Sequence, residues 1–264
     1  MLTLKGIKKT FNKGTVTEKP ALLGVDLHLD RGDFVTVIGG NGAGKSTMLN
    51  SIAGVFPVDA GTITLDGTDV TRLSEPQRAR YLGRVFQDPM RGTAADMQIE
   101  ENLALAARRG KRRGLRVGIT REEREEYREK LAILGLGLET RLADKVGLLS
   151  GGQRQALTLL MASLNSPDLL LLDEHTAALD PKTAAKVLEL SQKIVTENGL
   201  TTLIVTHNMH DAIRLGNRLI MMSDGKIIYE VSGEEKAKLH RADLMAKFEE
   251  AAGAELASDR MLLG

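Results

Sequence analysis

The chain contains no cysteine, so disulfide bonds and thiolate metal sites are excluded. It has no run of about 20 apolar residues, the length that spans a bilayer, since uncharged stretches such as 34–44 and 155–167 are shorter and contain polar residues or glycine. Residues 1–5 lack the apolar core of a signal peptide. The net charge of only +1 gives no case for general nucleic-acid binding, which needs a strongly basic domain. We therefore expect a cytosolic protein that relies on other chains for any membrane-spanning part.

What is present is a globular composition, 42% hydrophobic and 27% charged, over 264 residues. This length suits an α/β core that carries an inserted subdomain. Continuous apolar runs are typical of parallel strands buried on both faces. The predicted strands are 2–11 at an edge, Phe34–Ile38, Gly83–Phe86, Leu169–Asp173, Thr201–Thr206, and a closing hairpin of 218–222 with 226–231. A crossover helix is predicted over Pro181–Asn198.

The middle of the chain, from about Asp88 to Leu164, contains no convincing strand. Helices are predicted at 100–108, 120–134 and 150–164, and Thr120 with Glu123 forms a capping box at the start of the second. In the tail after residue 232 a helix is expected, because Leu244 and Phe248 share one helical face. We expect an α/β core at 1–87 and 165–232, a helical subdomain at 88–164 and a tail at 233–264.

A glycine-rich loop follows the strand Phe34–Ile38 and precedes a helix at 46–53. It reads Gly39-Gly40-Asn41-Gly42-Ala43-Gly44-Lys45-Ser46, a complete phosphate-binding loop. Backbone N–H groups of Asn41–Thr47 are expected to surround the β- and γ-phosphates of a nucleotide, with Lys45 against their oxygens. Ser46 is expected to ligate Mg²⁺. Asp173 ends another buried strand, so its carboxylate is expected beside the loop, where it can hold Mg²⁺ through water.

A second motif, Leu149-Ser150-Gly151-Gly152-Gln153, lies downstream of the loop and is predicted to open a helix. Together with Leu169–Leu172 followed by Asp173-Glu174, it gives the chain a resemblance to ATP-binding cassette (ABC) ATPases over nearly its whole length. The resemblance implies a P-loop NTPase (RecA-like) α/β core, an N-terminal antiparallel β subdomain and an inserted all-helical subdomain.

The family pattern also implies roles for individual residues. Glu174 polarises the attacking water, Gln87 binds the metal or the water, and His207 contacts the γ-phosphate. In the family two protomers pair head to tail, so Ser150, Gly151, Gly152 and Gln153 close over the partner's ATP, and Asp180 belongs to the loop that crosses the interface. Phe11 occupies the position of an aromatic residue that stacks on adenine, although it could equally pack in the core.

The sequence departs from the family pattern in three places. His175-Thr176-Ala177 replaces the common Pro-Thr-Ser/Ala, which puts a basic residue beside Glu174 where it either perturbs the carboxylate or is simply tolerated. Leu160-Met161-Ala162 replaces an arginine-bearing stretch. Six of the nine residues in Arg108–Arg116 are basic, which fits either a solvated loop or a surface near anionic lipid headgroups or an acidic permease.

By resemblance, the chain is the ATP-hydrolysing subunit of an ABC transporter, using ATP and Mg²⁺. The implied partners are a second ATPase protomer, integral-membrane permease subunits and an extracytoplasmic substrate-binding protein, with the chain peripheral at the cytoplasmic face of the membrane. His175–Thr183 and Thr206–Ala212 resemble ATPases of importers for small organic solutes such as aromatic amino acids. The alternatives are an exporter of lipid or lipoprotein and an ABC ATPase acting on nucleic acid or ribosomes. Such nucleic-acid ATPases usually have two cassettes or a long coiled coil, and this chain has neither.

Overall fold

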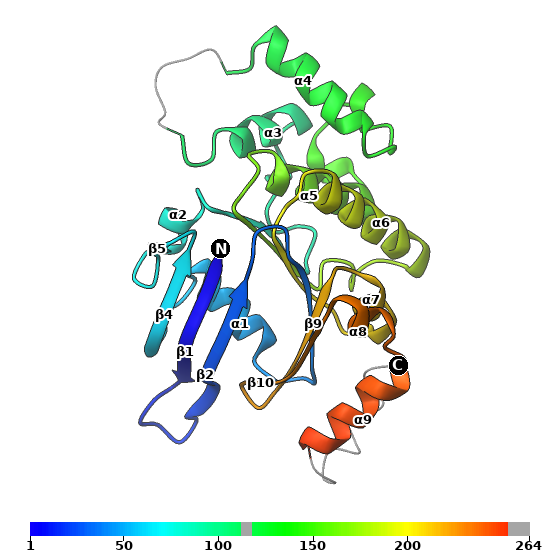
Figure 1. Ribbon diagram of the computed structural model, residues 1–264. Helices are drawn as coiled ribbons and strands as arrows, with labels where there is room; N and C mark the ends of the chain where they lie inside the picture. The colour runs from blue at the N-terminus through cyan, green and yellow to red at the C-terminus, as the bar shows by residue number, and fades with distance from the viewer. Residues whose placement is uncertain (112–117, 253–264) are drawn as a thin grey trace.

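The structure is a computed structural model that describes residues 1–111 and 118–252 (Figure 1). Its strands are β1 Leu2–Phe11, β2 Lys19–Leu29, β3 Phe34–Ile38, β4 Ala60–Leu65, β5 Thr68–Asp69, β6 Leu82–Val85, β7 Leu169–Asp173, β8 Thr202–Val205, β9 Arg218–Ser223 and β10 Lys226–Ser232. An antiparallel sheet has the order β2-β1-β4-β5. A larger sheet has the order β10-β9-β3-β8-β7-β6 and is parallel except for β10 at its edge.

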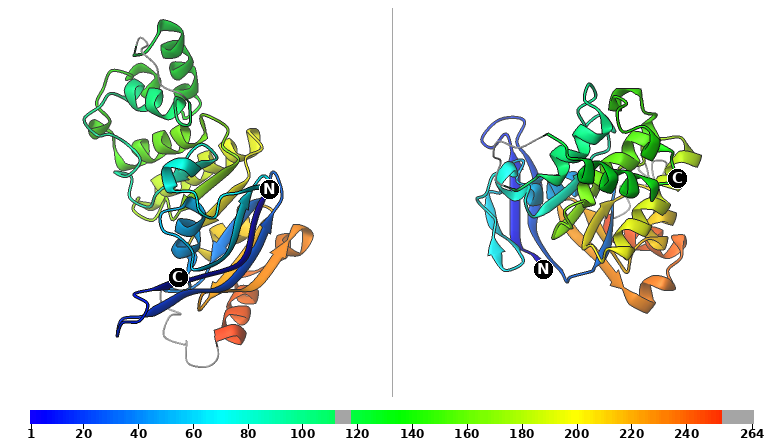
Figure 2. Two further views of the ribbon diagram at one scale, coloured as in Figure 1. Left: turned by 90° about the vertical axis from the view of Figure 1, so that its left-hand side faces the viewer. Right: turned by 90° about the horizontal axis from the view of Figure 1, so that it is seen from above.

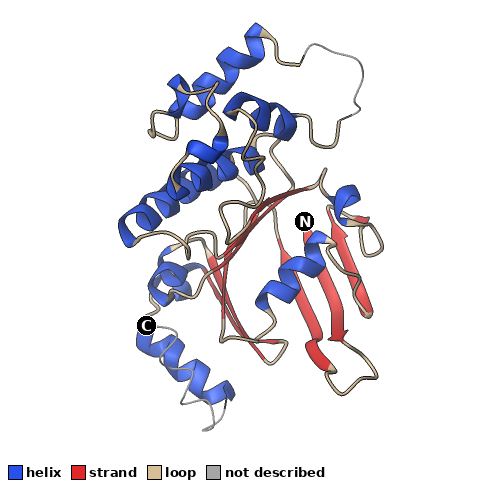
Figure 3. Ribbon diagram, turned by 180° about the vertical axis from the view of Figure 1, so that it is seen from behind, coloured by secondary structure: helices blue, strands red, loops and turns tan. Residues whose placement is uncertain are grey.

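The helices are α1 Lys45–Ala53, α2 Glu75–Arg78, α3 Ile99–Ala107, α4 Arg121–Ala132, α5 Gly151–Ser163, α6 Pro181–Glu197, α7 Met209–Arg214, α8 Gly233–Ala237 and α9 Arg241–Ala252, with 3₁₀ turns η1 Leu138–Thr140 and η2 Val146–Leu148. Figure 2 shows α3 and α4 gathered at one end of the molecule, away from the antiparallel sheet. With α1 between the strands of the two sheets (Figure 3), the architecture is the predicted α/β core.

The larger sheet is buried on both faces, and β7 shows how its apolar run is used. Alternate residues of a strand point to opposite faces. Leu169 and Leu171 pack in the cluster that contains α1 and the antiparallel sheet. Leu170 and Leu172 pack in the cluster that contains α5 and α6. Four consecutive leucines are therefore needed because both faces are covered, as the sequence predicted.

The middle of the chain is helical, as predicted. Within the described part of 88–164 there is no strand, only an isolated bridge between Gln98 and Lys145. The predicted capping box at α4 is present, since Thr120 Oγ accepts from the Glu123 amide at 3.2 Å and the Glu123 carboxylate accepts from the Thr120 amide at 2.8 Å. These two bonds satisfy backbone donors that the first helical turn leaves free.

Several predicted boundaries were wrong by one residue. Strand β6 covers 82–85 rather than 83–86, because its pairing with β7 ends with Val85 opposite Leu172. Strand β8 omits Thr201 and Thr206, helix α1 begins at Lys45, and α6 ends at Glu197. Differences of this size are expected at element ends, where the last turn or strand residue frays.

The tail forms two helices that pack beside β9 and α7. Leu244 of α9 is fully buried and Phe248 is partly buried in the same apolar cluster, which confirms that the two share a face. This cluster also contains Ile38, the last residue of β3 before the glycine loop. None of the helices in residues 1–111 and 118–252 has the length and apolar character needed to cross a membrane.

Candidate nucleotide site

The glycine loop lies between β3 and α1, and two of its glycines are required by close backbone contacts. A Cβ atom on Gly39 would lie 2.2 Å from the carbonyl oxygen of Met222, and one on Gly44 would lie 2.6 Å from that of Ala21. Gly42 has φ of +81°, a left-handed conformation that side chains disfavour. The loop can therefore hold its shape only with glycine at these positions.

Lys45 points into this loop from the first turn of α1. Its side-chain nitrogen donates to the carbonyl oxygens of Gly39 at 2.7 Å and Gly40 at 2.9 Å. Burial lowers the pKa of Lys45, while the charges of Glu174 and Asp173 act in the opposite direction. The structure thus concentrates one positive and two negative side chains around the loop that is built for phosphate.

Asp173, at the carboxyl end of β7, lies beside the start of α1. Its carboxylate forms an ion pair with Arg84 at 3.6 Å and lies close enough to the Ser46 side chain for that hydroxyl to lower the pKa of the carboxyl group. Burial raises the pKa of Asp173, and the charge of Glu174 adds to this, while Arg84 and Ser46 lower it. A hydroxyl and a carboxylate brought together in this way form a set of hard oxygen donors, which suits Mg²⁺.

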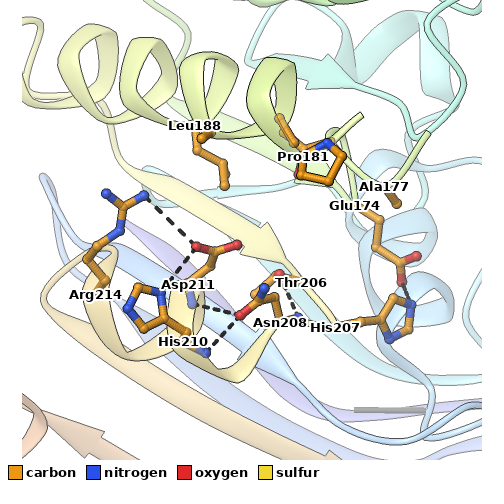
Figure 4. A pocket seen from close by; sticks show the side chains of 13 residues that line it. Glu174, Ala177, Pro181, Leu188, Thr206, His207, Asn208, His210, Asp211 and Arg214 are labelled. Carbon is orange, nitrogen blue, oxygen red and sulfur yellow. Dashed lines mark hydrogen bonds and ion pairs between the residues drawn. The ribbon is translucent and has the colours of Figure 1, made fainter. Parts of the chain in front are cut away.

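Glu174 and His207 point toward one another across the end of the loop (Figure 4). Glu174 Oε1 lies 2.6 Å from His207 Nε2. The Glu174 backbone is left-handed, with φ of +45°, a conformation that costs about 1 kcal/mol for a residue with a side chain. Strain of this kind persists only where the surroundings impose it, here with the Glu174 amide bonded to Val205 O.

One pocket of about 340 Å³ collects much of the predicted site. It is lined by the loop residues Asn41–Thr47, by Glu174 and His207 and by Phe11. Phe11 is only half-buried, contacts Phe56 edge to face with ring centres 5.2 Å apart, and belongs to none of the three apolar core clusters. Its position is that of a pocket wall rather than of core packing.

Gln87 lies just outside β6 and is exposed. It lines a neighbouring hollow of about 500 Å³ together with Asp173, Asn50 and Arg84. The structure therefore brings Gln87 to the Asp173 side of the site, with its amide free to approach a ligand.

The signature residues do not line the phosphate pocket of their own chain. Ser150 caps α5, accepting from the Gln153 amide at 3.3 Å, while Gln153 Oε1 accepts from the Ser150 amide at 3.2 Å. A Cβ on Gly152 would lie 2.1 Å from Thr183 Cγ2, so this glycine lets α5 approach α6 closely. Asp180 is the N-cap of α6, and hydrogen bonds from Thr183 lower the pKa of its carboxylate.

His175 is turned away from the site, and this decides whether its ring can perturb the neighbouring Glu174. It is 1% exposed, and its Nε2 lies 2.8 Å from Ser191 Oγ. Burial lowers the pKa of His175 to about 4, so the ring is neutral near pH 7. Of the two alternatives for this position, the second therefore applies: the ring is tolerated as an uncharged part of the core and brings no positive charge to Glu174.

One feature of the site, Arg84, was not predicted. Arg84 donates to Asn50 Oδ1 at 2.7 Å as well as pairing with Asp173, and so links β6, α1 and β7. The sequence offers one sign of this role: an arginine stands between the apolar residues of a buried strand.

The basic run is only partly free. Arg108 pairs with Glu123 at 3.1 Å, and Arg109 donates to the Ala162 carbonyl at 3.0 Å. These two partly exposed residues therefore link helices, Arg108 to α4 and Arg109 to α5. Residues 112–117, which contain three more of the basic residues, lie outside the described part of the chain.

Known proteins with similar sequences and structures are ATP-binding subunits of transporters. A family model described as ABC transporter matches residues 22–177. The tyrosine transport ATP-binding protein of Clostridioides difficile is 44% identical, an alignment that covers 94% of this chain and 99% of the relative. The lipoprotein-releasing system ATP-binding protein LolD 1 of Caulobacter vibrioides is 38% identical over 88% of this chain and 96% of its own. Among solved structures, the post-hydrolysis dimer of the ATP-binding cassette MJ0796, bound to ADP and Pi, has a TM-score of 0.74 at 33% identity and covers 88% of this chain and 98% of that one.

Proposed function

This chain belongs to the ATP-binding subunits of ABC transporters, and on that premise we propose that it powers the import of a small organic solute. It is an ATP hydrolase of the ABC type. The proposal specifies that two protomers close around two ATP molecules and that hydrolysis reopens them. The movement would be transmitted to separate permease subunits, so that the chain works at the cytoplasmic face of the membrane.

The observation that carries the dimer proposal is the incompleteness of the pocket. The phosphate loop, Glu174 and His207 share one pocket, but Ser150–Gln153 is not among its lining residues. The amides at the start of α5 form a helix N-terminus, where an anion is favoured. A second copy of the chain would supply this terminus to the ATP, with Asp180 at the junction. The dimeric arrangement of a relative at 33% identity supports this.

Within the site, Lys45 and the loop amides would bind the β- and γ-phosphates. Ser46 and Asp173 would hold Mg²⁺, because the Ser46 hydroxyl lies near enough to the Asp173 carboxylate to lower its pKa, and Gln87 would approach the same ligand. The metal ion, when bound, offsets the charge that develops on the phosphate oxygens. Phe11 would stack on the adenine.

Glu174 would accept a proton from the attacking water, a role that needs a carboxylate within hydrogen-bond reach. In the structure this carboxylate is engaged with His207 at 2.6 Å. A γ-phosphate that draws His207 toward itself would release Glu174 for the water. The pair therefore couples nucleotide recognition to the availability of the general base.

The two relatives support a small amino-acid solute more than a lipoprotein. The tyrosine transport protein matches 94% of this chain at 44% identity, against 38% over 88% for the lipoprotein-releasing protein. We therefore propose an aromatic amino acid as the solute, delivered by an extracytoplasmic binding protein. Export of lipid or lipoprotein is the alternative, because such ATPases share the same site.

The test is solute uptake in cells that lack this chain. Loss of labelled tyrosine or phenylalanine uptake, restored by the wild-type gene but not by Glu174→Gln, is the expected result. The matched control is Lys238→Met, an exposed lysine far from the pocket, which should restore uptake fully. Unchanged amino-acid uptake together with failed lipoprotein release would replace import by export.

A further inference from the structure

Lys236 is a buried cation outside the nucleotide pocket. Its side chain is 2% exposed, and its nitrogen donates to the carbonyl oxygens of Ile213 at 3.0 Å and Gly216 at 3.0 Å, and also to that of Leu215. Burial lowers the pKa of Lys236 to about 8. No carboxylate in residues 1–111 and 118–252 forms an ion pair with it. Backbone carbonyls are thus what compensates its charge.

These carbonyls mark the C-terminal end of α7. The last carbonyls of a helix have no partner within the helix and carry partial negative charge, so a cation there is stabilising. Lys236 comes from α8, in the tail. The tail therefore caps a helix that belongs to the ATP-binding core.

The other end of α7 leads directly to His207. Asn208 caps the helix, since its Oδ1 accepts from the amides of His210 at 2.9 Å and Asp211 at 3.1 Å. His207 is the preceding residue, and its ring reaches Glu174 (Figure 4). Because α7 has only six residues, it is far below the length at which a helix is stable alone. Its position depends on its caps and on packing.

The packing of α7 also involves the tail. Met209 and Ala212 of α7 lie in one apolar cluster with Leu244 of α9 and with Ile38, which precedes the phosphate loop. The tail thus contacts α7 by a charge at one end and by apolar side chains along its length. We propose that Lys236 is a positioning residue that places His207, through α7, against the γ-phosphate.

The same arrangement recurs at the other helix that leads from the pocket. Arg78 is 1% exposed and donates to the carbonyl oxygens of Ser51 and Ile52, each at 2.7 Å, at the C-terminal end of α1. Helix α1 follows the phosphate loop as α7 follows His207. The helix after the phosphate loop and the helix after His207 therefore each have a buried cation bound to the carbonyls of their C-terminal end, which supports a positioning role over chance burial.

The inference rests on the proposed role of His207, and the experiment separates the two. Single-site variants Lys236→Met and His207→Ala and the double variant are compared for kcat, for KM and for binding of ADP. Lys236→Met should lower kcat about tenfold and leave the dissociation constant of ADP, which has no γ-phosphate, within about twofold. In the His207→Ala background the same substitution should change the residual kcat by less than about twofold. Lys236 is proposed to act through His207, and that side chain is already absent from this background.

Lys238→Met, on the exposed side two residues away, is the matched control and should behave as wild type. If Lys236→Met does not fold, Lys236→Gln replaces it; because glutamine keeps an N–H donor but not the charge, its loss of kcat should be smaller and should likewise disappear in the His207→Ala background. An equal loss of kcat in both backgrounds would overturn the inference, as would an unchanged kcat in the folded single variant. If His207→Ala alone leaves kcat unchanged, the proposed role of His207 fails instead.

Discussion

Protonation of His175 should make this protein sensitive to mild acid, and the structure gives the size of the effect. The ring is buried against Ser191 of α6. The Ser191 hydroxyl donates its single proton to Val187 O at 2.8 Å, so the Nε2 atom of His175 must donate to Ser191. The buried ring therefore has a neutral form with the proton on Nε2.

The direction follows from the folded and unfolded pKa values of His175. Its pKa is lowered from 6.5 to about 4 by burial. Above pH 6.5 neither state binds the proton, and the full stability is present. As the pH falls below 6.5, the unfolded chain takes up a proton that the folded chain refuses. The free energy of unfolding then falls by about 1.4 kcal/mol per pH unit, or about 2 kcal/mol by pH 5, until the pH reaches the folded pKa.

The assay is urea unfolding of wild type and His175→Gln between pH 7.5 and pH 5. Glutamine keeps an N–H donor for Ser191 and does not titrate. The stability difference between the two proteins should therefore shift by about 2 kcal/mol in favour of the variant as the pH falls. His240→Gln, at an exposed position, is the control and should follow wild type. A difference that stays constant over this range would refute the buried, neutral state of His175.

Three further predictions concern the nucleotide site. Glu174→Gln should retain ATP binding while hydrolysis falls about 10²–10⁴-fold, the weight of a general base; a steady-state ATPase assay with undiminished turnover would remove Glu174 from that role. Lys45→Ala should weaken binding of a fluorescent ATP analogue, since it removes the cation that the loop carbonyls hold at 2.7 and 2.9 Å, and normal affinity would count against the loop. Ser150→Arg should abolish the ATP-dependent dimer seen by light scattering while one protomer still binds ATP. A dimer of normal stability in that variant would argue against the shared site.

Local features of the chain were predictable because they depend on neighbours in sequence. Glycine spacing indicates a backbone that must approach a phosphate, and Gly39 and Gly44 indeed have no room for a Cβ. The leucine run of β7 indicates a strand covered on both faces, and Thr120 with Glu123 indicates a helix start. Each of these patterns can be recognised in a short stretch of sequence, although the groups that crowd Gly39 and cover β7 come from distant parts of the chain.

The direction and partner of a side chain depend on residues that are distant in sequence. His175 and Glu174 are adjacent, yet one is buried against α6 and the other faces His207. Lys236 in the sequence is one lysine in a polar stretch, and only the packing of the tail places it at the end of α7.

By itself, the sequence determined the α/β class, the phosphate loop and the order of motifs that identifies an ABC ATPase, because these are encoded in local spacing and periodicity. Only the tertiary structure decided which charged side chains come into contact. The contact of Glu174 with His207, the link from Arg84 to Asp173 and the cap that Lys236 provides all join segments separated by many residues. Their geometry follows from how the sheet and its helices pack, and no local pattern records it.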